Sequence, residues 1–214
     1  MADNISRPGF RWAKGNAHPM PSPHKVHVAT AASFDVSGGA SNVALRAGDP
    51  VTMLSTGTVT LCAGFEASGT AVAVYGIVVG VAPYWDAAQG LMVPTNALPS
   101  DVAWGTVEER KSTLYVVPAE AGFWEIECDD ASTATTEAAY RAFIGENCDH
   151  SLAGASGTLV NPRLDISTHV TTTAQWRIEG ISDTADNRDF SGNYVKLIVR
   201  VNEGQASVFT ASGI

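Results

Sequence analysis

The chain has little charge, few cysteines and no long apolar run. Charged side chains make up 16% of its 214 residues, against about 25% in a typical soluble domain, and the net charge is −9. No apolar run reaches the roughly 18 residues that a membrane-spanning helix needs. Free nucleic acid is a poor partner for an acidic surface. We therefore expect a protein that binds neither a membrane nor nucleic acid.

Cysteine is scarce, with only Cys62, Cys128 and Cys148 in the chain. An odd number of cysteines without CxxC spacing predicts neither a disulfide framework nor a zinc ribbon. Two interpretations remain open. The cysteines are buried free thiols of a protein made in a reducing cytoplasm, or one of them bonds a neighbouring subunit after release into an oxidising medium.

Catalytic motifs are also missing. The sequence contains no GxSxG, P-loop, GxGxxG or HExxH pattern. Glu125 and Glu127 share one face of an expected strand, and paired carboxylates can hydrolyse glycosides. The simpler interpretation is a solvated face, with Trp124 and Ile126 in the core on the other side. We expect no catalytic residues and no enzyme.

Metal ligands are not grouped in a recognisable way. His24 and His27 are three residues apart on a segment that looks extended, so their side chains point to opposite faces. The acidic loop at 183–189 lacks the spacing of a calcium-binding EF-hand, and Asp and Asn are common turn residues. We expect no metal site and no cofactor.

Short apolar segments between turn residues predict a mainly β fold, built as a β-barrel or a β-sandwich (jelly-roll-like), with one short helix. The apolar run 71–82 favours a buried strand with a bulge or bend at Gly76 or Gly80. The helix is expected at 137–144, capped by Thr135 or Thr136. The other principal strands are expected at 51–54, 58–62, 112–117, 123–127, 158–160, 164–167, 174–180 and 194–202.

The first 25 residues differ from the rest in charge. They carry four basic residues and one acidic residue, a net charge of +3, whereas the remainder carries −12. Four prolines exclude a helix or a central strand in this segment. It also lacks the apolar stretch of a secretory signal, so we expect none. Two large aromatics, Phe10 and Trp12, are unusual in a disordered tail. We interpret 1–25 as an extended arm that docks on a partner, and 26–214 as a single β-rich domain; the alternative is an unattached terminus.

Several segments, in their order and spacing, resemble a known family. The chain resembles the capsid decoration (cement) proteins of tailed bacteriophages, which begin with an Arg-Pro-Phe-Gly-Phe-Arg-like arm; here the Phe between Pro8 and Gly9 is absent. The segments that carry this resemblance are 5–11 (ISRPGFR), 48–51 (GDPV), 76–81 (GIVVGV), 112–117 (STLYVV), 123–127 (FWEIE), 181–187 (ISDTADN) and 195–202.

The resemblance implies a mainly β protein that is made in the host cytoplasm and lies on the outer capsid surface of the virion. Its partners would be the major capsid protein and two further copies of itself in a homotrimer. The arm would supply the capsid-binding residues, with the aromatics as anchors and the basic residues as steering charges. These residues are Arg7, Phe10, Arg11, Trp12 and Lys14.

Two other functions remain as alternatives. The first is a carbohydrate-binding or host-adsorption β module, in which Tyr84, Trp85 and Trp104 stack on sugars. The second is an enzyme that uses Glu125 and Glu127, which the absence of any catalytic motif makes the weakest of the three.

Overall fold

The structure is a computed structural model. It describes residues 9–13, 20–28, 44–62, 73–86, 90–98, 113–129, 134–152, 161–170, 174–191 and 194–202. The strand expected at 158–160 lies outside these ranges.

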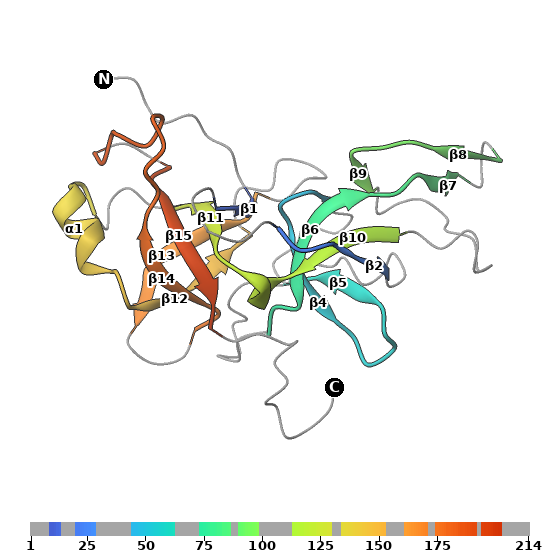
Figure 1. The fold of residues 1–214 in the computed structure, drawn as a ribbon, viewed down its shortest axis with the longest axis horizontal. Coiled ribbons are helices and arrows are strands. Elements are labelled where there is room, and N and C mark those ends of the chain that lie inside the picture. Colours follow the sequence, from blue (N-terminus) through green and yellow to red (C-terminus); the bar gives the residue numbers. More distant parts are fainter. Residues whose placement is uncertain are drawn as a thin grey trace.

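The larger sheet has six antiparallel strands and forms one end of an elongated molecule (Figure 1). In spatial order its strands are β1 (Arg11–Trp12), β11 (Trp124–Glu127), β15 (Lys196–Val201), β14 (Trp176–Ile181), β12 (Asn147–Ser151) and β13 (Arg163–Val170).

The second sheet has five antiparallel strands and forms the other end of the molecule. In spatial order they are β2 (His24–His27), β10 (Thr113–Pro118), β6 (Gly76–Val81), β4 (Pro50–Met53) and β5 (Val59–Leu61). Two small ribbons accompany it, β3 (Leu45–Arg46) with β9 (Ala97–Leu98) and β7 (Tyr84–Asp86) with β8 (Leu91–Val93).

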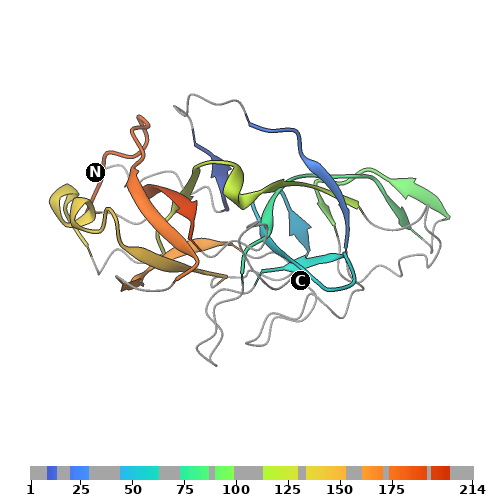
Figure 2. The same ribbon diagram turned by 60° about the horizontal axis from the view of Figure 1, so that its bottom comes forward.

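Both sheets are strongly curled, as the turned view in Figure 2 shows. A single parallel bridge joins Val28, just after β2, to Val59 in β5, so the two edges of the smaller sheet meet. In the larger sheet, Cys128 at the end of β11 forms a similar bridge to Leu164 in β13. The mainly β fold predicted from sequence is confirmed, although neither sheet closes through a continuous ladder.

The apolar run around 76–81 lies where the sequence predicts. Its described part forms β6, which is hydrogen-bonded to β10 on one side and β4 on the other. Tyr115 pairs with Gly80 and Val116 with Val78, so Val79 is the extra residue of a β-bulge. The prediction of a strand with a bulge is confirmed, with the bulge at Val79, next to Gly80.

One helix, α1 (Glu137–Ala142), matches the prediction. The hydroxyl of Thr136 accepts a hydrogen bond from the Ala139 N–H at 3.2 Å and caps its N-terminus. Gly145, with φ of +95°, ends the segment in a left-handed conformation that suits glycine. Among the described residues, no helix has the length and hydropathy required to cross a membrane.

The two sheets share part of their packing. The chain leaves β10 through the short 3₁₀ turn η3 (Ala119–Ala121) and enters β11 directly, so it passes from one sheet to the other. The main core contains Trp124 and Trp176 of the larger sheet and also Ile77 and Val117 of the smaller one. A second core lies within the smaller sheet, around Leu45, Val51 and Leu114.

The predicted division between an arm at 1–25 and a body at 26–214 does not hold for the described residues. Residues 11–12 form β1, the edge strand of the larger sheet, and residues 24–27 form β2, the edge strand of the smaller one. The first segment of the chain is therefore part of both sheets.

Candidate functional site

Residues 9–13, which we call the docked segment, are held to the body by backbone hydrogen bonds. The Gly9 N–H donates to the Pro162 carbonyl at 3.0 Å, and the Phe10 N–H donates to the Gly48 carbonyl at 2.8 Å. Strand β1 then pairs antiparallel with β11. The docked segment thus contacts loops and strands that are distant in sequence.

Two glycines allow this close approach. Gly9 and Gly48 have φ of +97° and +98°, which side chains rarely adopt. A Cβ on Gly9 would lie 3.2 Å from the Gly48 Cα. Glycine is therefore required at both positions by the backbone conformation and by the contact between the two backbones.

Phe10 is a core residue, with 2% of its surface exposed. Its ring stacks on Trp176, with centroids 4.3 Å apart and an interplanar angle of 30°. It also meets the His150 ring edge-to-face at 5.9 Å. A side chain this deeply buried has no surface to offer a second protein.

His150 links the two sheets through a hydrogen-bonded chain. The Trp176 indole N–H donates to His150 Nδ1 at 3.1 Å, so Nδ1 is an acceptor and the proton lies on Nε2. Nε2 in turn donates to the Cys62 carbonyl at 3.0 Å. Burial lowers the pKa of His150 to about 4, against the opposing effect of its hydrogen bonds. The imidazole is neutral at physiological pH.

Trp12 is half-buried and meets Trp124 edge-to-face, with centroids 5.3 Å apart and an interplanar angle of 88°. The expectation that Phe10 anchors the chain on a capsid is corrected by these contacts, because Phe10 lies inside the protein's own core. Trp12 packs against this core but keeps part of its surface exposed. A basic, Pro-rich pattern does not distinguish docking within one chain from docking on another.

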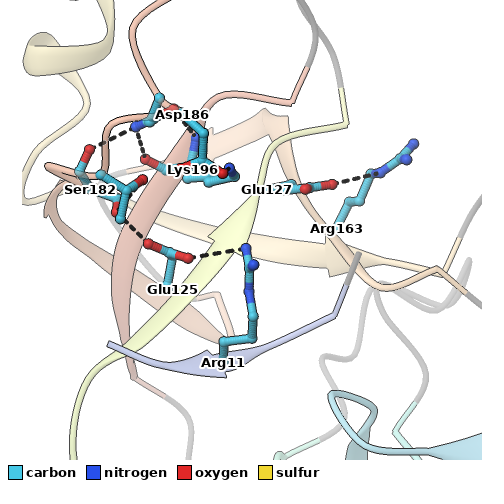
Figure 3. A network of polar contacts seen from close by, with 9 residues as sticks. Arg11, Glu125, Glu127, Arg163, Ser182, Asp186 and Lys196 are labelled. Atoms are coloured by element: carbon cyan, nitrogen blue, oxygen red, sulfur yellow. Dashed lines mark hydrogen bonds and ion pairs between the residues drawn. The ribbon is translucent and has the colours of Figure 1, made fainter. Parts of the chain in front are cut away.

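Arg11 opens a network of polar contacts on the opposite face of β11 (Figure 3). Its guanidinium lies 3.0 Å from Glu125 Oε1. The Ser182 hydroxyl donates to the other oxygen of the same carboxylate. This pairing assigns Arg11 to the fold, in place of the steering role expected for it.

The same network continues to two fully buried charged side chains. Lys196, 1% exposed, donates from Nζ to Asp186 at 2.5 Å, and this hydrogen bond lowers the Asp186 pKa to about 2. Glu127 lies opposite Lys196 in the β11–β15 pairing, and its carboxylate is 3.8 Å from Arg163 Nε. The side-chain oxygen of Asn187 accepts a hydrogen bond from the backbone N–H of Lys196 at 2.8 Å.

The charges of this polar network balance, with three cations facing three carboxylates. Glu127 is fully buried and the Glu125 side chain is only 12% exposed, so the prediction that both lie on a solvated face is wrong. The prediction that Trp124 and Ile126 face the core is confirmed. Because Glu127 and Lys196 each have a partner of opposite charge, neither is an uncompensated charge in the interior, and removing one partner would be strongly destabilising.

A second buried carboxyl supports the turn that holds Phe10. Asp49 is fully buried and accepts a hydrogen bond from the Arg46 N–H at 2.8 Å. Burial raises its pKa to about 7, although the bond from Arg46 opposes the shift. The Arg46 guanidinium bonds Asn161 at 2.8 Å, which ties this turn to the segment that contacts Gly9.

The remaining candidate residues are separated in the structure. Imidazole Nδ1 of His24 lies 3.1 Å from the Tyr75 hydroxyl and that of His27 lies 3.4 Å from Thr113 Oγ1. In the described ranges, no group of three potential metal ligands comes together. In the acidic loop, Asp183 pairs with Arg188 at 2.7 Å.

The three cysteines are free and buried, and burial raises the pKa of each thiol. A buried sulfur is out of reach of a neighbouring subunit, so the structure favours buried free thiols over a bond to a neighbouring subunit. Three of the expected functional residues, Arg7, Lys14 and Trp104, lie outside the described residues, as does the side chain of Trp85.

Sequence reasoning did not identify His150, Trp176 or Ser182 as important, because each acquires its role only through a partner on another strand. No protein-family model, curated protein or solved structure matches the chain. The function must therefore be argued from the sequence motifs and from the chemistry of the described residues.

Proposed function

We propose that the chain is a capsid decoration protein of a tailed bacteriophage, which binds the outer surface of the icosahedral head as a homotrimer and bridges major capsid protein subunits. The observation that carries the proposal is the ordered set of motifs that resembles this family. Several of these motifs meet in space: Gly9 packs on Gly48, Arg11 pairs with Glu125, and Glu125 accepts from Ser182. Motifs that are far apart in the chain thus form one structural unit.

The contact with the capsid is assigned to exposed side chains, since Phe10 is buried and Trp12 packs partly against the core. The β7–β8 ribbon extends from the far end of the smaller sheet (Figure 1). Leu91 and Met92, which are consecutive on this ribbon, are 46% and 47% exposed, so two large apolar side chains are available there for a partner. Arg7 and Lys14, which flank the docked segment in sequence, remain proposed capsid-binding charges.

Co-sedimentation with undecorated, expanded heads tests this proposal. The purified protein should pellet with the heads. A double variant, Leu91→Ser with Met92→Ser, should bind at least about tenfold more weakly, because each buried apolar side chain contributes roughly 1.5–3 kcal/mol. Ile144→Ser is the matched control, since Ile144 is 41% exposed beyond α1, at the opposite end of the molecule. Failure of the unaltered protein to bind heads would reject the proposal.

The proposed charges are tested separately by Arg7→Ala with Lys14→Ala. The loss of head affinity caused by this variant, measured against the unaltered protein, should be larger at low salt than at high salt. The reason is that salt screens solvated ion pairs. Arg188→Ala, at an exposed ion pair elsewhere, is the control. Equal binding at every salt concentration would remove Arg7 and Lys14 from the proposed contact.

A further inference from the structure

A pocket of about 410 Å³ lies beside the docked segment, where β1, η3 and the end of β15 come together. The residues that define its chemistry are Trp12, Glu120, Gly122, Arg200 and Asn202. Its volume is within the range of roughly 300–1,000 Å³ found for small-molecule sites. Neither the polar network nor the proposed capsid contact uses this pocket.

Trp12 supplies a rigid aromatic wall. Its six-membered ring lies directly against the backbone of Gly122, where a Cβ would collide with Cη2. The edge-to-face contact with Trp124 fixes the ring from another side. The indole N–H has no hydrogen-bond partner among the described residues.

The polar groups of the pocket include both donors and acceptors. Glu120 is exposed, has no ion-pair partner in the described part of the chain, and has a pKa raised by partial burial. Asn202 uses its amide N–H₂ to bond the Ala174 carbonyl at 2.9 Å, which leaves its side-chain oxygen as an acceptor. Arg200 pairs through Nε with Glu179 at 2.6 Å and keeps its other N–H groups as donors.

We propose that this pocket binds a neutral saccharide, with the apolar C–H face of a pyranose ring on Trp12 and its hydroxyls hydrogen-bonded to Glu120, Asn202 and Arg200. A sugar ring combines one apolar face with hydroxyls that both donate and accept, which matches the wall and the polar groups described above. A cationic ligand would be opposed by Arg200 and an anionic ligand by Glu120.

This site is independent of capsid binding and adds a second activity to the molecule. The strength of attachment rests on the proposed function: on a capsid that displays many copies, even a weak sugar site gives strong attachment, because multivalent binding multiplies single-site affinity. The ligand class agrees with the alternative function considered from sequence, but the residues differ from the loop aromatics Tyr84, Trp85 and Trp104.

The test is a titration with cellobiose and with N,N′-diacetylchitobiose, followed through the NMR resonance of the Trp12 indole N–H. Trp12→Phe identifies this resonance by its loss. At least one disaccharide should shift it saturably, whereas sorbitol, a flexible polyol without a ring face, should not. Glu120→Gln should weaken binding about tenfold, since it removes a charged acceptor. Glu137→Gln, on the exposed face of α1, should leave it unchanged.

Three outcomes would overturn the assignment. The first is the absence of a saturable shift with either disaccharide. The second is an equal response to sorbitol, and the third is tighter binding of arginine amide, which would indicate a cation site. Glu120→Gln lies on the surface and should leave head binding intact, so failure of the sugar site and failure of the capsid proposal are distinguishable.

Discussion

Among single residues, His150 has the most demanding environment. Both ring nitrogens are committed in the neutral form, one accepting from Trp176 and the other donating to Cys62. Protonation would place a second donor opposite the indole N–H and a charge in the core. The native packing around Phe10 therefore requires His150 to be neutral.

Acid should weaken the fold through His150. Its pKa is about 4 in the native state and 6.5 ordinarily, so the unfolded chain binds more protons between these values. Stability from this residue is complete above pH 6.5 and falls by about 3 kcal/mol as the pH drops to 4. Urea unfolding at several pH values should show this loss.

The comparison with His150→Gln isolates the contribution of this histidine. The variant lacks the titrating group, so its stability should depend less on pH between 4 and 6.5, even if it is lower throughout. Asp49, whose raised pKa gives a pH dependence of opposite sign, is present in both proteins and cancels in the difference. Parallel pH profiles for the two proteins would contradict the assignment.

The local sequence was sufficient to predict some elements and not others. The α1 cap at Thr136 and the bulge in β6 follow from neighbouring residues, and both are confirmed. In β15, Leu197 and Val199 lie in the core, and Lys196 is also buried, although a lysine side chain is ordinarily solvated. Lys196 is buried because the loop with Asp186 and Asn187 covers that face, and the pattern of one strand carries no information about its cover.

The docked segment is the element whose role changed most between sequence and structure. Its aromatics correctly indicate docking, but the partner is the chain's own pair of sheets. Phe10→Ala should lower the free energy of unfolding by about 3–5 kcal/mol, because it leaves a cavity against Trp176. Met20→Ala, at a residue 45% exposed, should change it little. Denaturant unfolding measures both, and equal stabilities would show that the segment does not pack as described.

The pairing of β6 with β10 depends on the absence of a side chain at Gly76. A Cβ there would lie 2.5 Å from Val116 Cγ1 and 2.6 Å from the Val117 carbonyl oxygen. Gly76→Ala should therefore destabilise the protein by roughly 1–3 kcal/mol through overpacking. Gly180→Ala is the matched control, because a Cβ at Gly180 meets nothing within 4 Å. Thermal unfolding of the two variants should rank them in this order; the reverse order would contradict the packing of β6.

For the whole molecule, the main prediction is assembly. The proposed function requires homotrimers, and equilibrium sedimentation at micromolar concentration should give a particle of three chains, either alone or when released from heads. The Leu91→Ser, Met92→Ser variant distinguishes the two uses of the β7–β8 ribbon. It should remain trimeric if the ribbon contacts the capsid, whereas dissociation would place the ribbon between subunits. A strictly monomeric protein, free and on heads, would contradict the assembly.

The stacking of Phe10 on Trp176 also has a consequence for biosynthesis. Among the strands that the structure describes, Phe10 precedes the first, and Trp176 lies in β14, the last but one. At roughly 5–20 residues per second, the ribosome makes Trp176 several seconds or more after Phe10. During that interval Phe10 lacks its native partner, so the nascent chain carries this apolar ring without its stacking partner until β14 has been made.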